Sequence, residues 1–297
     1  MELIKAFLNY LYLEKKYSKH TIDSYKNDLV SFFKYVEKEF EGASIEKVHY
    51  AQIRSWIVFL VQKKISNNSV NRKMSSLKSF YKFLIKTKTI SVNPLQKHKS
   101  LKVPKRVNVP FNKKEIEEVL SMLNEKTDYI SLRNKLIVEL FYTTGIRRSE
   151  LIGLKLSDID LKQNTIKVLG KRNKERYIPV LNILQRSIIE YLKKRKEFSR
   201  NKEYLFLTQK QKKLYGTLVY RLINNYFSSV STKVKKSPHV LRHAFATHLL
   251  NEGADLNAVK ELLGHASLAS TQVYTNSSLS ELKNVYNRAH PRSSSKK

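Results

Sequence analysis

The chain has 297 residues and no cysteine, which excludes disulfides, thiolate metal sites and a cysteine nucleophile. Its 57 Lys and Arg residues against 25 Asp and Glu give a net charge of +32, and such an excess indicates a polyanionic partner. No apolar run is long enough to span a membrane and the N-terminus lacks a secretory signal, so we expect an intracellular nucleic-acid-binding protein.

Four amphipathic helices are predicted in the first 95 residues. Apolar side chains recur at helical spacing within residues 1–15, 50–63 and 67–86. They also recur in a helix that would be capped by Ser18 or Thr21 and extend to Val36. Residues 47–114 contain no Asp or Glu at all. We therefore expect a small all-α domain with a basic outer surface.

Residues 96–110 are interpreted as a linker, because Asn93-Pro94 ends the helical pattern and prolines and lysines follow. The composition favours an extended strap along nucleic acid, and a disordered spacer is the alternative. A second domain begins at residue 111. Asn112 followed by Glu115 predicts a capped helix over 113–123, with another over 129–143.

A short motif follows the second of these helices. Gly145 is suited to end a helix, which places Arg147 at a junction between helices. Glu150 lies three residues further on and can hold Arg147. An arginine positioned by a carboxylate is suited to bidentate binding of a phosphate.

A β-hairpin is predicted over 164–180, with strands at 164–169 and 176–180 and a loop at 170–175. Lys171 in this loop can reach into a groove and donate a proton, although a solvated turn lysine is the simpler interpretation of the residue alone. Further elements are predicted in chain order: a helix at 182–197, a strand at 204–207 and a helix at 215–230.

The C-terminal part carries the most informative residues. Ser237-Pro238 predicts a helix start, and His239 and Arg242 then share a face near the positive end of the helix dipole. A following helix over 256–263 ends at Gly264, so that His265 lies just beyond it. Tyr274 is expected on a third short helix, and 279–288 shows helical apolar spacing again. Each residue alone has an ordinary explanation, but together they suit attack on a DNA phosphate by a phenol oxygen.

These motifs resemble the tyrosine recombinases of the phage integrase family, in the Xer subgroup. The resemblance rests on Thr144 to Leu151, Gly170-Lys171, His239 to His243, Leu263-Gly264-His265 and Tyr274. It implies a fold that is mainly α with a small β-sheet, arranged as a two-domain clamp around a duplex. An N-terminal four-helix SAM-like core-binding domain (1–95) and a linker (96–110) would precede a mixed α/β catalytic domain (111–297).

The resemblance also implies the site residues. The catalytic set would be Arg147, Lys171, His239, Arg242, His265 and Tyr274. Tyr274 would form a 3′-phosphotyrosyl bond, with His239 as general base, Lys171 as general acid and His265 hydrogen-bonded to the phosphate. The two arginines would clamp the phosphate oxygens, a contribution of roughly 3 kcal/mol each. No Walker A or Gly-x-Gly-x-x-Gly motif and no metal-ligand cluster is evident, so no cofactor and no metal are expected.

Two residues depart from the family pattern. Arg172 stands where a second glycine is common in the hairpin loop, which makes Lys174 a rival for the role of Lys171. Arg148 stands where an aliphatic residue is more usual.

The expected partners are double-stranded DNA with paired half-sites and three further protomers, in a homo- or hetero-tetramer with a paralogous recombinase. Helix 279–288 would be donated to a neighbouring protomer. A septal DNA translocase is a further candidate partner, and no membrane partner is expected. The expected location is cytoplasmic and nucleoid-associated. The expected function is chromosome dimer resolution through a Holliday junction. The alternatives are an integrase or invertase of a mobile element, a type IB topoisomerase-like activity, and an architectural DNA-binding protein.

Overall fold

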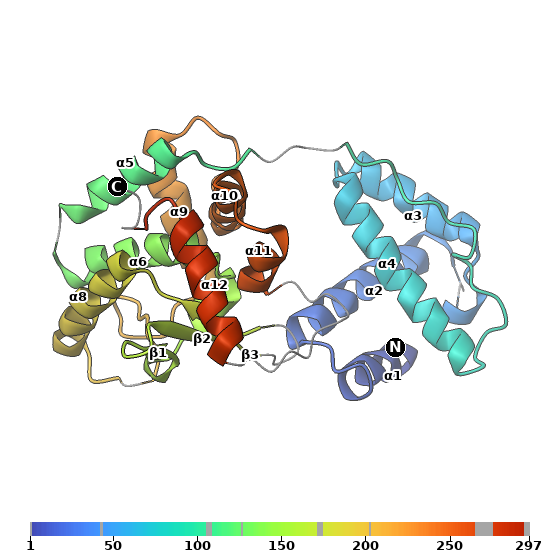
Figure 1. Ribbon diagram of the computed structural model, residues 1–297. Coiled ribbons are helices and arrows are strands. Elements are labelled where there is room, and N and C mark those ends of the chain that lie inside the picture. The colour runs from blue at the N-terminus through green and yellow to red at the C-terminus, as the bar shows by residue number, and fades with distance from the viewer. Residues whose placement is uncertain are drawn as a thin grey trace. The chain divides into compact units, whose positions relative to one another are not determined.

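The computed structural model describes residues 2–41, 44–104, 109–125, 127–170, 175–201, 203–264 and 276–293 (Figure 1). The chain divides into two compact units, Met1–Arg106 and Val107–Lys297. Each unit has its own hydrophobic core. In the described residues no helix is both long and apolar enough to cross a membrane.

The first unit is a helical domain. It consists of α1 (Glu2–Leu13), α2 (Lys19–Glu39), a short 3₁₀ turn (Ile45–Lys47), α3 (Tyr50–Gln62) and α4 (Asn67–Lys86). The helical spacing places apolar side chains such as Phe7, Trp56 and Phe80 fully inside. Ser18 caps α2 by accepting a hydrogen bond from the Thr21 amide. The predicted helical N-terminal domain is therefore confirmed.

A buried carboxylate joins α2 to α4 in this unit. Asp28 is 1% exposed and receives both guanidinium nitrogens of Arg72, the ammonium of Lys73 at 3.0 Å and the hydroxyl of Ser76 at 2.8 Å. Removing these partners would leave an unpaired buried charge. Two cations share the one carboxylate, so a positive charge remains on this part of the domain.

Part of the predicted linker packs against the first unit. The Asn71 side-chain amide bonds both the N–H and the C=O of Leu101 at 2.9 Å. Asn67 donates to the carbonyl of Lys102 at 2.7 Å. Side-chain amides on α4 thus hold Leu101 and Lys102, in a segment whose composition favours an extended strap along nucleic acid over a packed element.

The second unit is built around α6 (Tyr129–Thr144), which packs against α5 (Lys113–Asn124), α8 (Asn182–Phe198) and α10 (Pro238–Asn251) (Figure 1). Nearly every residue in the second half of α6 is buried. The other helices are α7 (Arg148–Gly153), a 3₁₀ turn (Leu156–Asp158), α9 (Gly216–Val230), α11 (Leu256–Leu263) and α12 (Asn276–Ala289). A helix buried on all sides leaves little freedom to the residues that follow it.

A small antiparallel sheet completes the second unit. Its strands are β1 (Ile159–Asp160), β2 (Thr165–Leu169) and β3 (Glu175–Pro179), in the order β1-β2-β3. Ile166 lies opposite Ile178, and Leu169 lies opposite Glu175 at the end of the predicted hairpin. The mainly α fold with a small sheet is confirmed.

The predicted strand at 204–207 is wrong. This segment makes only two isolated bridges within the described residues, Lys155 with Tyr204 and Leu207 with Lys213. Buried side chains occupy its carbonyls instead: Arg195 and Tyr191 each donate to Leu205 at 2.8 Å. An apolar run of four residues indicates burial but does not identify its hydrogen-bond partners.

The second half of α12 is docked on its own chain. The helix packs against α10 and β3. Tyr286 is fully buried and its hydroxyl donates to the Thr143 carbonyl. His290 is also fully buried, 3.3 Å from the Tyr142 carbonyl. Donation of this helix to a neighbour, expected from the family resemblance, would require these contacts to be released.

Candidate active site

The candidate site begins at the C-terminal end of α6, where Gly145 adopts a left-handed conformation with φ of +59°. A Cβ atom at this position would lie 2.5 Å from Cδ1 of Phe245 and 2.8 Å from Cδ2 of Leu263. Glycine is therefore required at position 145 for two reasons: the positive φ angle and the lack of space for a side chain. The close approach brings the end of α6 against both α10 and α11.

Arg147 lies two residues beyond Gly145 and caps α7. Its amide donates to Oε2 of Glu150 at 2.9 Å, and its Nη1 donates to Oε1 at 2.8 Å. Its Nη2 donates to the Gly264 carbonyl at 2.9 Å. The Arg147 side chain is 34% exposed while that of Glu150 is 3% exposed. The predicted pairing of these residues is present, and it leaves part of the guanidinium accessible.

Arg242 projects from α10 to the same place. It is buried and donates to the carbonyls of Gly145 and Leu263, the latter at 2.7 Å. Burial, reinforced by the nearby charge of Arg147, lowers the pKa of Arg242 to about 10. The guanidinium remains protonated at neutral pH, but its charge is poorly solvated. An anion bound nearby would relieve that penalty.

A third arginine, Arg176 on β3, completes the cluster. It is 5% exposed and donates to both oxygens of Glu150, at 2.8 and 2.9 Å. Burial raises the pKa of the Glu150 carboxyl, but hydrogen bonds from Arg176 and Arg147 more than offset this, so that pKa lies below its ordinary value. Three guanidinium groups thus surround one ionised carboxylate, leaving two positive charges in excess.

Sequence reasoning missed Arg176. A signal was available in the alternation of β3, where Arg176 and Ile178 are both buried on one face while Glu175 and Tyr177 are exposed. A charged residue at an inward position of a strand predicts a buried partner, because an unpaired charge there is too costly.

His239 occupies the first turn of α10, directly after Pro238. Its side chain is exposed. Partial desolvation, together with the charges of Lys235 and Arg242, lowers the pKa of His239 below its ordinary value. The imidazole is therefore neutral at neutral pH and able to accept a proton.

The helix predicted to start at Ser237-Pro238 begins there, but without a side-chain cap. Ser237 is the N-cap residue of α10, but its hydroxyl does not bond the helix amides. Its Oγ is buried and has no hydrogen-bond partner in the described part of the chain. Pro238 instead begins the helix at the position where the missing amide costs nothing.

Lys171, His265 and Tyr274 lie outside the described residues, as do Arg172 and Lys174. The described ends of these segments are nevertheless informative. Gly264, with φ of +62°, ends α11 and precedes His265. Its carbonyl and that of Leu263 are bonded by Arg147 and Arg242. The structure thus brings together two of the six predicted residues with the backbone that leads to a third.

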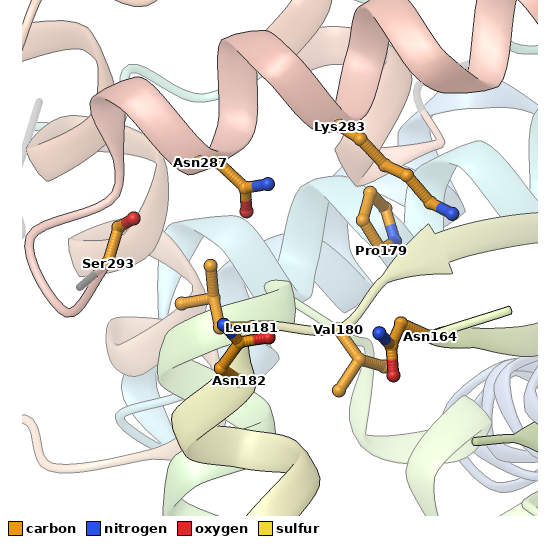
Figure 2. Close-up of a pocket in the computed structure, with 8 residues that line it drawn as sticks. All are labelled: Asn164, Pro179, Val180, Leu181, Asn182, Lys283, Asn287 and Ser293. Carbon is orange, nitrogen blue, oxygen red and sulfur yellow. The ribbon is translucent and has the colours of Figure 1, made fainter. Parts of the chain in front are cut away.

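A separate cavity of about 150 Å³ lies between the second half of α12 and the segment joining β3 to α8 (Figure 2). Figure 2 shows Lys283 and Asn287 on the helix side of this cavity. The Lys283 ammonium donates to the Gln163 carbonyl at 2.8 Å. Of the predicted catalytic residues that the structure describes, Arg147, His239 and Arg242, none lines this cavity; its described lining is Asn164, Pro179, Val180, Leu181, Asn182, Lys283, Asn287 and Ser293.

Within the described ranges, no three His, Asp or Glu side chains are grouped as a metal site would require. The expectation that the chemistry needs no metal or cofactor stays a prediction.

Two family models match most of the chain. The phage integrase family matches residues 110–281, and the phage integrase N-terminal SAM-like domain matches residues 4–88. The tyrosine recombinase XerC of Anoxybacillus flavithermus is 40% identical over 294 residues, covering 97% of both chains. The XerC of Listeria innocua is 39% identical over 297 residues, covering 98% of both. The chain therefore belongs to the phage integrase family.

Solved structures agree on the fold. The Tn1549 transposon integrase bound to transposon right-end DNA is 22% identical, with a TM-score of 0.72 over 95% of this chain and 99% of that one. The XerH recombinase bound to its difH substrate is 24% identical, with a TM-score of 0.67 over 89% and 79% of the two chains. The chain is a tyrosine recombinase of the Xer subgroup and a site-specific DNA recombinase, as its motifs predict.

Proposed function

We propose that this recombinase cleaves and rejoins double-stranded DNA through a 3′-phosphotyrosyl intermediate. Tyr274 attacks the phosphorus, and the 5′ oxygen of the next nucleotide leaves as a hydroxyl. His239 takes the phenolic proton, and Lys171 protonates the leaving oxygen. A phenol ionises near pH 10 in water, so the reaction depends on this assistance at neutral pH.

The cationic groups supply the electrostatic part of catalysis. Arg147 and Arg242 bind the non-bridging oxygens and stabilise the charge that accumulates on the five-coordinate phosphorus. His265 hydrogen-bonds the same phosphate. Attack by the freed 5′ hydroxyl on the phosphotyrosine reverses the step, so the bond energy is retained and no ATP is consumed.

The observation that carries this proposal is the arginine cluster. Arg147 and Arg242, which come from different elements, donate hydrogen bonds to consecutive backbone carbonyls at the end of α11. Burial partly removes water from the positive charge of Arg242. Such an arrangement favours an anion with several equatorial oxygens over a neutral ligand. A phosphodiester undergoing substitution has that form.

For the biological role we propose chromosome dimer resolution. Four protomers, identical or paired with a paralogous recombinase, would act on two sites through a Holliday junction, near the nucleoid. Similarity over nearly the whole length to proteins named XerC supports this role over a mobile-element integrase or invertase. A septal DNA translocase would be the regulator of such a reaction.

The proposal is tested by covalent trapping. A library of duplexes of roughly 30 base pairs, with two inverted half-sites about one helical turn apart, is nicked near the centre so that cleavage releases a short strand. The expected result is a denaturation-resistant protein–DNA adduct that retains a label at the 5′ end of the cleaved strand, because the protein is joined to a 3′ phosphate. An adduct carrying the downstream fragment instead would contradict the proposed polarity.

A further inference from the structure

Arg176, on the predicted hairpin, contacts two other segments that carry separate motifs of the site. Its Nη1 and Nη2 donate to the two oxygens of Glu150, and its Nε donates to the Leu262 carbonyl at 3.3 Å. Its side chain also lies close to Gly264, where a Cβ atom would be only 3.0 Å from Cδ and 3.1 Å from Nε. Arg176 itself follows directly after Glu175, the first residue of β3 beyond the hairpin loop.

The contacts form a closed ring. Arg176 bonds Glu150, Glu150 bonds the side chain and the amide of Arg147, and Arg147 bonds the carbonyl of Gly264. Gly264 packs against Arg176 and closes the circle. Movement of any one member therefore displaces the others.

We propose that Arg176 is a positioning residue for DNA cleavage. It fixes the carboxylate that orients Arg147 and the end of α11 that leads to His265, and it acts through them without touching the DNA. The inference rests on the function proposed above, because it assumes that Arg147 binds the scissile phosphate. It adds a residue on β3 to the group that sets the cleavage rate.

The geometry requires a guanidinium. Three donors in one plane reach two carboxylate oxygens and a carbonyl, and the flat face allows Gly264 to approach. An ammonium keeps the charge but cannot make these directed bonds together. Arg176→Lys therefore removes the positioning while sparing the charge balance of the cluster.

A matched control is available in the same unit. Arg195 on α8 is 3% exposed and donates to the carbonyls of Asn201, Tyr204 and Leu205, away from the site. Arg195→Lys also replaces a buried guanidinium that donates to three carbonyls by an ammonium. Any effect that arises from lost stability alone should be present in both variants.

The test measures the single-turnover rate of adduct formation on a nicked duplex that has been selected by trapping. Protein is saturating, and the temperature is one at which circular dichroism shows that every variant is folded. Arg176→Lys should form adduct at least 10-fold more slowly than wild type, with a duplex Kd within threefold. Arg195→Lys should remain within twofold of wild type in rate. The double variant Arg147→Lys/Arg176→Lys should lose less rate than the product of the two single losses, because part of the Arg176 effect passes through Arg147.

Several results would overturn the inference: an Arg176→Lys rate within twofold of wild type, an equal loss in Arg195→Lys, or losses that multiply in the double variant. Hydrogen exchange provides a readout independent of activity. Amides of residues 256–264 should exchange faster in Arg176→Lys than in wild type or Arg195→Lys, and unchanged exchange would refute the positioning. If wild type forms no adduct on any duplex, the proposed function fails, while the exchange result still decides whether Arg176 holds this segment.

Discussion

At the scale of single residues, the site depends on arginine geometry more than on charge. Arg147 makes directed bonds to Glu150 and to the Gly264 carbonyl, and its side chain remains 34% exposed. Arg242 is held by two carbonyls that come from different helices. Both guanidiniums are held by protein groups alone, so in the proposed mechanism little reorganisation is needed when charge develops on the phosphate.

Replacing Arg147 by lysine tests this geometric requirement. Arg147→Lys keeps a positive charge but cannot form two parallel bonds to phosphate oxygens. We expect single-turnover cleavage to fall about 100-fold, in line with loss of one oxyanion contact of roughly 3 kcal/mol. The duplex Kd should change by less than threefold in the same assay. A large loss of affinity with a small loss of rate would show that Arg147 serves binding instead.

The acid limb of the pH–rate profile tests His239. Its pKa lies below the ordinary value of about 6.5, so the neutral, proton-accepting form persists into mildly acidic solution. Single-turnover cleavage at pH 6.5 should therefore still exceed half of its plateau value, with the midpoint of the decline below that pH. The acid limb should disappear in His239→Gln, at a much lower rate. A half-maximal rate at or above pH 6.5 in the wild type would contradict the assignment.

At the scale of elements, the C-terminal segment is attached to its own chain by buried polar groups. His290 donates its Nε2–H to the Tyr142 carbonyl, and its ring packs against those of Tyr142, Phe245 and Tyr286. Arg292 pairs with the buried Glu139 of α6 at 3.3 Å. The contacts connect this segment to the helix whose end carries Gly145 and Arg147.

These contacts predict a pH dependence of stability. Burial, with the nearby charges of Arg292 and His248, lowers the pKa of His290 to about 3. Between about pH 6.5 and pH 3 the unfolded chain binds a proton that the folded chain excludes, so stability falls as pH falls. At pH 5.5 the loss is about 1 kcal/mol from His290 alone. Urea unfolding at pH 7.5 and 5.5 should show this difference in wild type and a smaller one in His290→Gln; equal pH dependence would refute it.

Local spacing predicted the elements well but not every contact. The helices of both units follow from apolar residues at helical intervals, and the pairing of Arg147 with Glu150 follows from their separation of three residues. The bonds from Arg242 to Gly145 and Leu263 join segments far apart in sequence, so no local pattern encodes them. Arg176 was missed because the prediction for this hairpin concerned the loop residues Lys171, Arg172 and Lys174 and not the inward positions of its strands. The strand predicted at 204–207 is wrong because the Tyr191 and Arg195 side chains donate hydrogen bonds to the Leu205 carbonyl, which a neighbouring strand would otherwise bond.

At the scale of the whole molecule, charge governs the encounter with DNA. The net charge of +32 includes an acid-free stretch from residue 47 to residue 114. The exposed face of α4 carries Lys78 and Lys82, one turn apart and opposite its buried stripe. Lysines placed in this way neutralise phosphates without reading sequence.

Salt dependence tests that role. Affinity for duplex DNA should fall linearly with the logarithm of salt concentration, because binding releases counterions. In Lys78→Gln/Lys82→Gln the magnitude of the slope should decrease by about 2, one for each lost phosphate contact. The pair Lys193→Gln/Lys196→Gln on α8, a helix that also carries Glu190 and Glu197, serves as control and should retain the slope. An unchanged slope in the α4 variant would remove this face from the DNA interface.

The identity of the nucleophile is the central claim, and mapping the covalent adduct tests it most directly. Wild-type protein is trapped on a selected nicked duplex and digested, and the DNA-linked peptide is identified by mass spectrometry. We predict that the linkage lies on Tyr274, and that Tyr274→Phe binds the same duplex with unchanged Kd but forms no adduct. An adduct on another residue, or adduct formation by Tyr274→Phe, would contradict the account.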